Sequence, residues 1–340
     1  MKILITGITG RVGANVARKL LSNGDDVRGF VWPGDRQAAK MRSVGAEIFE
    51  GDLANSEAVR SATKGQEVIL HLGAAFQAGG PFTPEQYMDT NVKGTFNVLQ
   101  AALELDDQLK HLIVTSTDAT MFKYPPDGID DPITEDSLPL VTTDWYGYTK
   151  VLCENLVNRY FRHSNLRATV IRFANVWGAG EILKFPSFHL STFVKQFEKR
   201  TDGAGSATYG RLKAEDTDGP RLIVARDMNG RSWKKHNIEV RDIVHAYDQV
   251  IGNPNTFGKT YQIGSKRPFT WEELIPYMSE KTGIPYSTVN LAMAPNYYEY
   301  DLSSARNDFG YDPKLSVFDM IDEAVRFNEK GTGDIIPTTV

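Results

Sequence analysis

The chain has 340 residues, 41% hydrophobic and 24% charged, which are ordinary values for a soluble globular protein of one large or two medium domains. Its formal net charge of -5 argues against nucleic acid as a partner, because that binding needs a basic face. No apolar run approaches the ~20 residues that cross a bilayer, and Gly7 interrupts the N-terminal MKILITG too early for a signal peptide. We therefore expect no membrane partner and a cytoplasmic location.

The first half of the chain alternates strand and helix patterns. Short apolar runs rich in β-branched residues predict strands at 2–6, 26–31, 46–53, 67–74, 111–117 and 167–176. Amphipathic patterns predict helices at 12–24, 56–65, 91–106 and 146–164. This alternation predicts an α/β fold with a doubly wound parallel sheet of the Rossmann type.

The pattern changes after Trp177. Residues 196–221 are polar and glycine-rich and are predicted to form a long surface loop, and 222–240 contains two strand-like runs joined at Asn229-Gly230, a hairpin signal. Helices are predicted at 242–253, 270–283 and 318–329, and a strand at 260–264. Within 270–283 the Thr and Glu three residues apart have capping-box spacing.

These patterns predict two domains. We expect an NAD(P)-binding Rossmann domain of residues 1–178 and 238–263, and a smaller C-terminal mixed α/β substrate domain of residues 179–237 and 264–330. The remaining residues, 331–340, are expected to form a flexible tail. A ligand cleft is expected between the domains, at the carboxyl edge of the sheet.

A glycine motif, Gly7-Ile8-Thr9-Gly10-Arg11-Val12-Gly13, lies directly between the first strand and the first helix. Glycines at such a turn let the backbone approach a pyrophosphate, and the helix N-terminus supplies N–H groups and a partial positive charge. The motif therefore predicts dinucleotide binding.

Its G-x-x-G-x-x-G spacing resembles that of the extended short-chain dehydrogenase/reductases, also called the NAD-dependent epimerase/dehydratase family. The resemblance continues in order through Gly51-Asp52-Leu53, His71 to Ala75, Asn91 to Thr95, Thr115-Ser116-Thr117, Tyr146 to Lys150 and Arg172 to Gly178. It covers residues 1–178 well and is looser from 222 to 327.

The resemblance implies that Thr117, Tyr146 and Lys150 are catalytic. Tyr146 and Lys150 share one helix face at i and i+4, and a nearby ammonium favours tyrosinate and lowers the pKa of the phenol. Such a tyrosine can take the proton of a carbinol as its hydride leaves for nicotinamide. Thr117 is expected to hydrogen-bond the same substrate oxygen.

The motifs and the resemblance together predict the remaining site residues. The cofactor is expected to contact Gly7, Thr9, Gly10, Arg11, Val12, Trp32, Arg36, Asp52, Leu53, Leu72, Gly73, Ala74, Asn91, Thr115, Tyr146, Lys150, Phe173 and Val176. The substrate is expected to contact Ala75, Phe76, Asp118, Asn175 and Lys235. The histidines have no metal-ligand spacing, so no metal is expected.

Three departures from the family pattern narrow the interpretation. NAD enzymes of the family have an acid at the end of the second strand that binds the adenosine ribose, but here the strand ends in Val31 and Trp32. Arg11 and Arg36 are nearby and could pair with a 2′-phosphate. The cofactor is therefore expected to be NAD or NADP, with the balance toward NADP. Ala119 replaces the glutamate of sugar-nucleotide dehydratases, which argues against dehydration. No arginine stands in 293–296 to bind a diphosphate, which favours a smaller sugar, sugar acid or lactone.

The leading function is an NAD(P)-dependent oxidoreductase that transfers hydride between nicotinamide and a secondary alcohol or ketone of a carbohydrate-like substrate. A UDP-sugar 4-epimerase remains an alternative, because it uses the same Tyr, Lys and hydride transfer. A non-catalytic NAD(P)-binding regulator is a further alternative, although the Tyr–Lys pair counts against it. The predicted helices at 91–106 and 146–161 resemble those through which the family forms homodimers, so a homodimer is expected.

Overall fold

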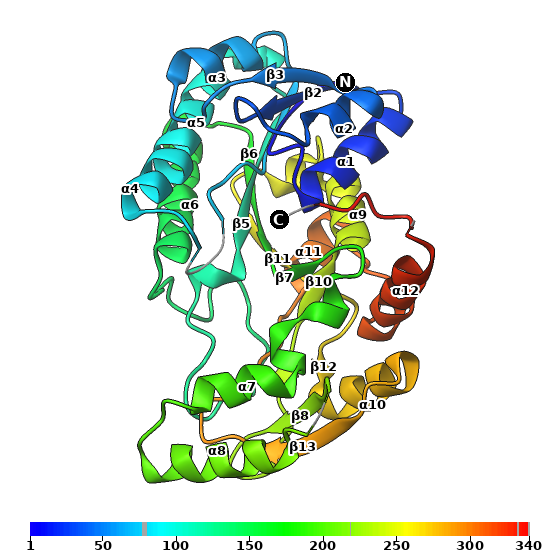
Figure 1. The fold of residues 1–340 in the computed structure, drawn as a ribbon. Helices are drawn as coiled ribbons and strands as arrows, with labels where there is room; N and C mark the ends of the chain where they lie inside the picture. The colour runs from blue at the N-terminus through cyan, green and yellow to red at the C-terminus, as the bar shows by residue number, and fades with distance from the viewer. Residues whose placement is uncertain (77–79, 218, 332, 339–340) are drawn as a thin grey trace.

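The computed structural model describes residues 1–76, 80–217, 219–331 and 333–338. Within them, seven parallel strands form a central sheet in the order β11-β6-β5-β4-β1-β2-β3 (Figure 1). The strands are β1 (Lys2–Thr6), β2 (Asp26–Val31), β3 (Glu47–Glu50), β4 (Val68–His71), β5 (His111–Thr117), β6 (Ala168–Phe173) and β11 (Thr260–Ile263). This confirms the predicted doubly wound fold, because the strand order reverses beside β1.

Helices cover both faces of the sheet, so successive strand residues enter different cores. Ile3 and Ile5 of β1 belong to one core and Leu4 to the other. One face carries α1 (Arg11–Ser22), α2 (Ala38–Ser43) and α9 (Val240–Val250), and the other carries α3 (Ser56–Thr63), α5 (Gly94–Glu104) and α6 (Trp145–Ser164). Burial of both faces explains why the central strands β1, β4 and β5 contain continuous apolar runs, whereas edge strand β3 carries glutamates at both ends.

A smaller unit with its own core lies beyond the carboxyl ends of the strands (Figure 1). Its strand pairs are β8 (Leu222–Arg226) with β13 (Tyr286–Asn290), and β9 (Lys234–Lys235) with β12 (Phe269–Thr270). Its helices are α7 (Leu190–Phe197), α8 (Gly203–Glu215), α10 (Trp271–Thr282) and α12 (Val317–Lys330). The predicted capping box between Thr270 and Glu273 starts α10.

Shorter elements connect these parts. They are α4 (Pro84–Tyr87), a π-helical turn (Met88–Lys93), α11 (Ser303–Phe309) and 3-10 turns at Asp106–Gln108, Asp118–Thr120, Glu181–Lys184, Pro186–Phe188 and Pro254–Thr256. Two further strands, β7 (Asn175–Trp177) and β10 (Asn237–Glu239), form a parallel pair at the junction of the two units.

Two predictions for the smaller unit need correction. The expected loop at 196–221 contains helix α8, because the Asp202 side chain accepts a hydrogen bond from the Gly205 N–H and fully buried Leu212 supplies an apolar contact. The turn at Asn229-Gly230 forms, with Gly230 at φ 84°. However, β8 pairs along its length with β13, and the returning chain reaches it only near Ser232 and Trp233.

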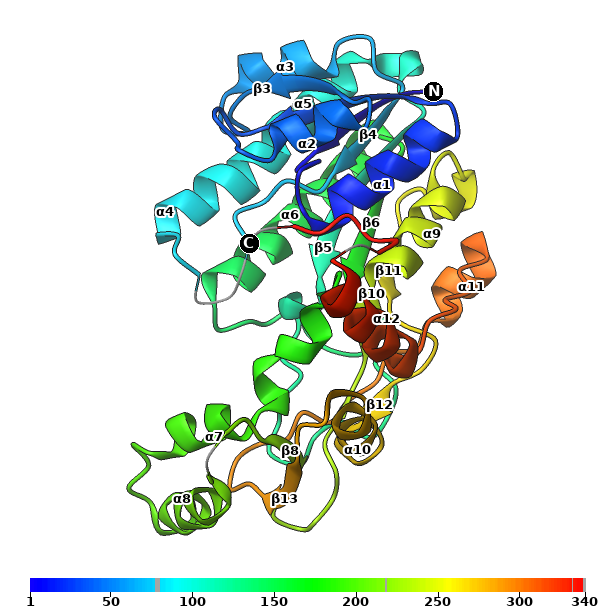
Figure 2. The same ribbon diagram turned by 45° about the vertical axis from the view of Figure 1, so that its right-hand side comes forward.

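The end of the chain returns to the larger unit. Tyr298 and Tyr311 lie in the core beside the sheet, although the sequence assigned this stretch to the substrate domain. The sequence also predicted a flexible tail, whereas the structure places residues 333–338 against α1 (Figure 2). There the Asn15 side chain hydrogen-bonds both the N–H and the carbonyl of Ile336, and Ile335 is buried. Residues 332, 339 and 340 lie outside the described residues.

None of the helices in the described part of the chain combines the length and apolar character needed to span a bilayer. The cytoplasmic location stays a prediction of the sequence.

Candidate active site

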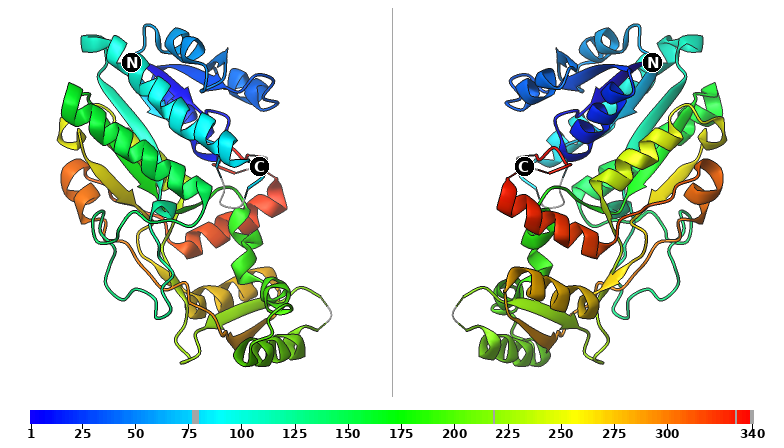
Figure 3. Two further views of the ribbon diagram at one scale, coloured as in Figure 1. Left: turned by 90° about the vertical axis from the view of Figure 1, so that its left-hand side faces the viewer. Right: turned by 90° about the vertical axis from the view of Figure 1, so that its right-hand side faces the viewer.

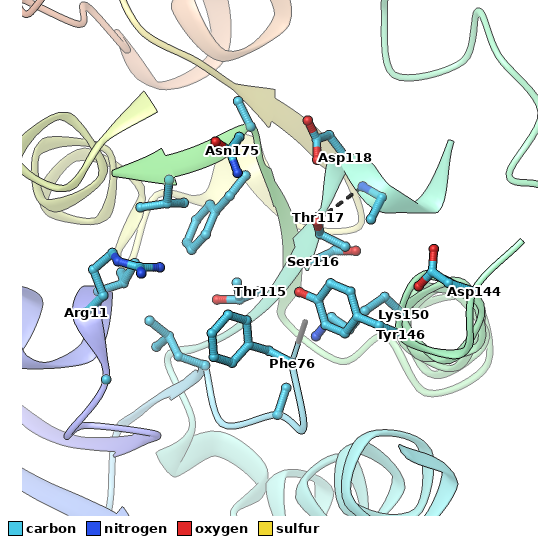
Figure 4. A pocket seen from close by; sticks show the side chains of 18 of the residues that line it. Arg11, Phe76, Thr115, Ser116, Thr117, Asp118, Asp144, Tyr146, Lys150 and Asn175 are labelled. Carbon is cyan, nitrogen blue, oxygen red and sulfur yellow. Dashed lines mark hydrogen bonds between the residues drawn. The ribbon is translucent and has the colours of Figure 1, made fainter. Parts of the chain in front are cut away.

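A cavity of about 730 Å³ opens at the carboxyl ends of β1, β4, β5 and β6 (Figure 4). Such a volume is typical of a small-molecule site. Most of the residues predicted from the sequence line it. They are Gly7, Thr9, Gly10, Arg11, Val12, Leu72, Gly73, Ala74, Phe76, Thr115, Thr117, Asp118, Tyr146, Lys150, Phe173, Asn175, Val176 and Lys235.

The three motif glycines have different roles. Gly7 has φ 70°, and a Cβ on it would lie 2.8 Å from the Gly73 backbone. A Cβ on Gly13 would lie 2.3 Å from the Gly7 carbonyl oxygen, so Gly13 lets α1 pack on the loop. A Cβ on Gly10 would lie 3.3 Å from the same Gly7 oxygen, which is a less severe contact, and Gly10 lines the cavity. Gly7 and Gly13 therefore serve the fold, and Gly10 leaves space for a ligand.

The N-terminus of α1 faces this space. Gly10 is its N-cap residue, and the first turn, all of it described, contains no acidic residue. Its free N–H groups and the partial positive charge of the helix end favour an anion. These residues fit the pyrophosphate of a dinucleotide.

Tyr146 and Lys150 project from the first turns of α6 toward the end of β5 (Figure 4). Asp144 caps this helix by accepting a hydrogen bond from the Gly147 N–H at 2.8 Å. Gly147 allows close packing, because a Cβ there would lie 2.3 Å from the Ala119 carbonyl oxygen. The Tyr146 hydroxyl hydrogen-bonds Thr117, so the three predicted catalytic residues meet at one wall of the cavity.

Burial dominates the electrostatics of this pair. It raises the pKa of Tyr146 above its usual range, although the hydrogen bond with Thr117 acts in the opposite direction. Burial also lowers the pKa of Lys150, opposed by the nearby Cys153 and Glu154. The sequence predicted that Lys150 would lower the pKa of Tyr146, whereas desolvation of the phenolate raises it.

In the part of the chain that the structure describes, six predicted residues lie away from the cavity wall: Trp32, Arg36, Asp52, Leu53, Asn91 and Ala75. Trp32 and Arg36 are exposed to solvent. The Asp52 side chain accepts a hydrogen bond from the Ala54 N–H. Leu53 packs in the core beside Gly73 and Gly94.

Asn91 stabilises the backbone next to the cavity through hydrogen bonds. Its side chain bonds both the N–H and the carbonyl of Ala75, at 2.8 and 2.9 Å, and also Thr149 at 2.9 Å. It is buried, as is Ala75. Asn91 therefore ties the segment after β4 to α6 instead of contacting a ligand from the cavity wall.

The two arginines expected to favour NADP are placed differently from each other. Arg11 lines the cavity but is paired with Glu181 at 2.7 Å, whereas Arg36 is exposed and does not line the cavity. Asp35, the residue before Arg36, accepts a hydrogen bond from the Thr9 hydroxyl at 2.6 Å. A carboxylate therefore stands beside the glycine loop, four residues after β2 ends.

The far end of the cavity contains residues that the sequence did not single out. Lys123 donates to the Asp118 carbonyl at 2.5 Å and pairs with its carboxylate at 3.3 Å. Behind the cavity wall, the hydroxyl of Tyr300, which is not itself a lining residue, donates to the same carboxylate at 2.6 Å. Further lining residues that the sequence missed include Gln37, Phe122, Tyr124, Thr142, Tyr298 and Thr338. They lie in irregular segments, where periodicity carries no signal.

Comparison with known proteins extends these observations. The model of the NAD dependent epimerase/dehydratase family matches residues 3–264. A 2-alkyl-3-oxoalkanoate reductase of Stenotrophomonas maltophilia is 26% identical, over 93% of this chain and 96% of the relative. A UDP-glucose 4-epimerase of Corynebacterium glutamicum is 32% identical, over 84% of this chain and 82% of the relative.

Among solved structures, a short-chain dehydrogenase/reductase superfamily protein from Agrobacterium tumefaciens with bound NAD superposes with a TM-score of 0.82. It is 29% identical and the match covers 97% of each chain. The likeness therefore extends over both the sheet and the smaller unit.

Proposed function

The chain belongs to the NAD-dependent epimerase/dehydratase family, and we propose that it is an NAD-dependent oxidoreductase acting on a secondary alcohol or ketone of a small sugar-derived molecule. The observation that carries this proposal is the meeting of Thr117, Tyr146 and Lys150 at one wall of the cavity that the glycine loop also lines. A dinucleotide on the loop and a carbinol at Tyr146 would share this space.

The chain's own residues supply the proton chemistry. A nicotinamide cofactor held by the glycine loop at Gly10 would supply the hydride acceptor for oxidation, and the hydride donor for reduction. Tyr146, as phenolate, takes the hydroxyl proton, and Thr117 hydrogen-bonds the same oxygen. The Lys150 ammonium stabilises the phenolate. The carbinol thus loses a hydride and a proton and becomes a ketone, and in reduction Tyr146 returns the proton.

The cavity wall supports a compact substrate. Of the described residues between 179 and 330, Lys235 and Tyr298 alone line the cavity. Two arginines that could have bound a diphosphate are paired elsewhere: Arg226 with Glu272 at 2.6 Å, and Arg231 with Asp227 at 3.1 Å. This arrangement favours a dehydrogenase or reductase over a UDP-sugar epimerase, although relatives of both kinds exist.

We further propose NAD as the cofactor. Asp35 beside Thr9 would repel a 2′-phosphate and could accept a hydrogen bond from a ribose hydroxyl. Arg11 is paired with Glu181, and Arg36 is exposed and does not line the cavity. These placements weaken the sequence-based argument for NADP, and we therefore favour NAD. The neighbour from Agrobacterium tumefaciens, which binds NAD, agrees with this choice.

Absorbance at 340 nm tests the reaction class. The protein is mixed with NAD and a panel of aldoses, uronates, aldonates and alditols, with Tyr146→Phe as the control. We expect one substrate to produce NADH with the wild type and little with the variant. Conversion of a UDP-sugar without net absorbance change would identify an epimerase instead. No change with any compound would favour a regulator.

A further inference from the structure

One cation at the far end of the cavity has no counter-ion in the part of the chain that the structure describes. The Lys235 side chain, carried by β9, is 6% exposed and lines the cavity. Its Nζ lies 4.5 Å from the centre of the Phe185 ring. Within the described residues it has neither an ion-pair partner nor a hydrogen-bond acceptor. A buried ammonium is stable only when its charge and its N–H groups are satisfied.

The nearest acid is already occupied. The Asp118 carboxylate pairs with Lys123 at 3.3 Å and accepts the Tyr300 hydroxyl at 2.6 Å. Burial lowers the pKa of Lys235 to about 8, with Asp118 raising it and Lys123 lowering it. Lys235 therefore remains mostly protonated at neutral pH, and Lys123, Lys235 and Asp118 together leave one excess positive charge.

A second polar group that lines the cavity is also unsatisfied among the residues that the structure describes. The Asn175 Oδ1 atom is buried without a hydrogen-bond partner in the described structure, and Asn175 lines the cavity. Together with Lys235 it indicates that a polar ligand completes this part of the cavity, because buried polar groups are otherwise paired.

We propose that the substrate is a hydroxy acid whose carboxylate binds Lys235 while its hydroxyl faces Tyr146. A neutral hydroxyl would give Lys235 one hydrogen bond but leave its charge uncompensated, whereas a carboxylate supplies both. A diphosphate would need more basic groups than this end of the cavity offers. The inference deepens the proposed function and rests on it for the role of the hydroxyl. The carboxylate itself is unchanged by the reaction.

Calorimetry tests the carboxylate site separately from turnover. The NAD-saturated protein is titrated with D-gluconate, D-glucuronate, D-galactonate and L-threonate, and with the neutral partners D-glucose, sorbitol and erythritol. We compare wild type, Lys235→Met, Lys235→Arg and, as a control, Lys184→Met, which removes an exposed lysine of the neighbouring 3-10 turn. Thermal denaturation and NAD titration verify that each variant is folded.

We expect an acid to bind the wild type, and its affinity to fall about 10- to 100-fold in Lys235→Met, the range of a charge-assisted hydrogen bond. Lys235→Arg should retain much of the affinity, and Lys184→Met all of it. Acid binding of this pattern without NADH formation would support the site and contradict the proposed reaction. Equal binding of neutral partners, unchanged affinity in folded Lys235→Met, or no binding by any acid would overturn the inference.

Discussion

The Glu154 carboxylate and the Arg172 guanidinium form a bidentate ion pair in the protein interior, with N–O distances of 2.9 and 2.8 Å. The two side chains are only 6% and 5% exposed. The Ser116 hydroxyl also donates to Glu154. Since Glu154 lies on α6 with Tyr146, and Ser116 precedes Thr117 on β5, this network fixes the helix that carries Tyr146 against the strand that carries Thr117.

Removing one partner of this pair should be costly. We expect Glu154→Ala to lower the free energy of unfolding by about 3–5 kcal/mol, because it leaves the Arg172 charge buried and unpaired. Glu57→Ala, which removes an exposed partner of Arg60, should cost less than about 1 kcal/mol. Urea denaturation compares the two variants, and equal losses would show that the buried network contributes little.

Two substitutions in the glycine loop should separate binding from folding. Gly10→Val puts methyl groups into the cavity and requires only a small shift of the Gly7 carbonyl, 3.3 Å from the new Cβ, so we expect a folded protein with at least tenfold weaker NAD binding. Gly13→Val should fail to fold, since its Cβ would lie 2.3 Å from the Gly7 carbonyl oxygen. Calorimetric NAD titration and thermal denaturation measure both effects. Wild-type NAD affinity in Gly10→Val would contradict the assignment of this loop.

Loss of the Tyr146 hydroxyl should affect turnover more than binding. We expect Tyr146→Phe to lower kcat by about 10²–10⁴-fold, the usual value of general acid–base catalysis, with NAD affinity retained. The comparison uses the substrate identified by the absorbance panel. A variant that turns over at the wild-type rate would exclude Tyr146 as the base.

The raised pKa of Tyr146 also predicts a pH profile. Oxidation needs the deprotonated phenol, whose fraction rises about tenfold per pH unit below the pKa, so kcat/KM should increase with pH through the neutral range. Lys150→Met removes a stabilising ammonium and should move the profile to higher pH. A profile that is flat from pH 6 to 9 would mean that a different group accepts the proton.

Cofactor choice should depend on Asp35. We expect the wild type to bind NAD at least tenfold more tightly than NADP, because the Asp35 carboxylate beside Thr9 repels a 2′-phosphate. Asp35→Asn should narrow that ratio, and Asp26→Asn, at the exposed start of β2, should leave it unchanged. Dissociation constants for both cofactors on each preparation decide this. Tighter NADP binding by the wild type would restore the interpretation based on Arg11 and Arg36.

The homodimer remains a prediction, and two exposed aromatic residues make it testable. Phe96 on α5 and Tyr148 on α6 are 42% and 47% exposed, and the two helices lie side by side on one face (Figure 3). We expect light scattering to give twice the 37.9 kDa chain mass at micromolar concentration. Phe96→Asp should reduce it to the single-chain mass, and Tyr286→Asp, on distant β13, should not. A wild-type monomer would reject the dimer.

The sequence alone determined the features that depend on local order along the chain. Alternating strands and helices predicted the sheet, because each element buries a face that its own periodicity defines. The spacing of Gly7, Gly10 and Gly13 predicted the loop, and Tyr146 and Lys150 four residues apart predicted a shared helix face. These relationships involve residues close together in the sequence, so they can be recognised without knowledge of the rest of the fold.

The tertiary structure decided which groups each side chain contacts. Helix α8 forms in a stretch rich in glycine because its Leu212 finds an apolar partner surface, and 333–338 is held by contacts with Asn15. Arg11 was expected to bind phosphate, but Glu181, 170 residues later in the chain, neutralises it. Among the residues that the structure describes, Lys235 has no ion-pair partner, and Lys123 and Tyr300 already occupy Asp118. Such outcomes depend on competition among groups distant in sequence, and only the folded chain brings those groups together.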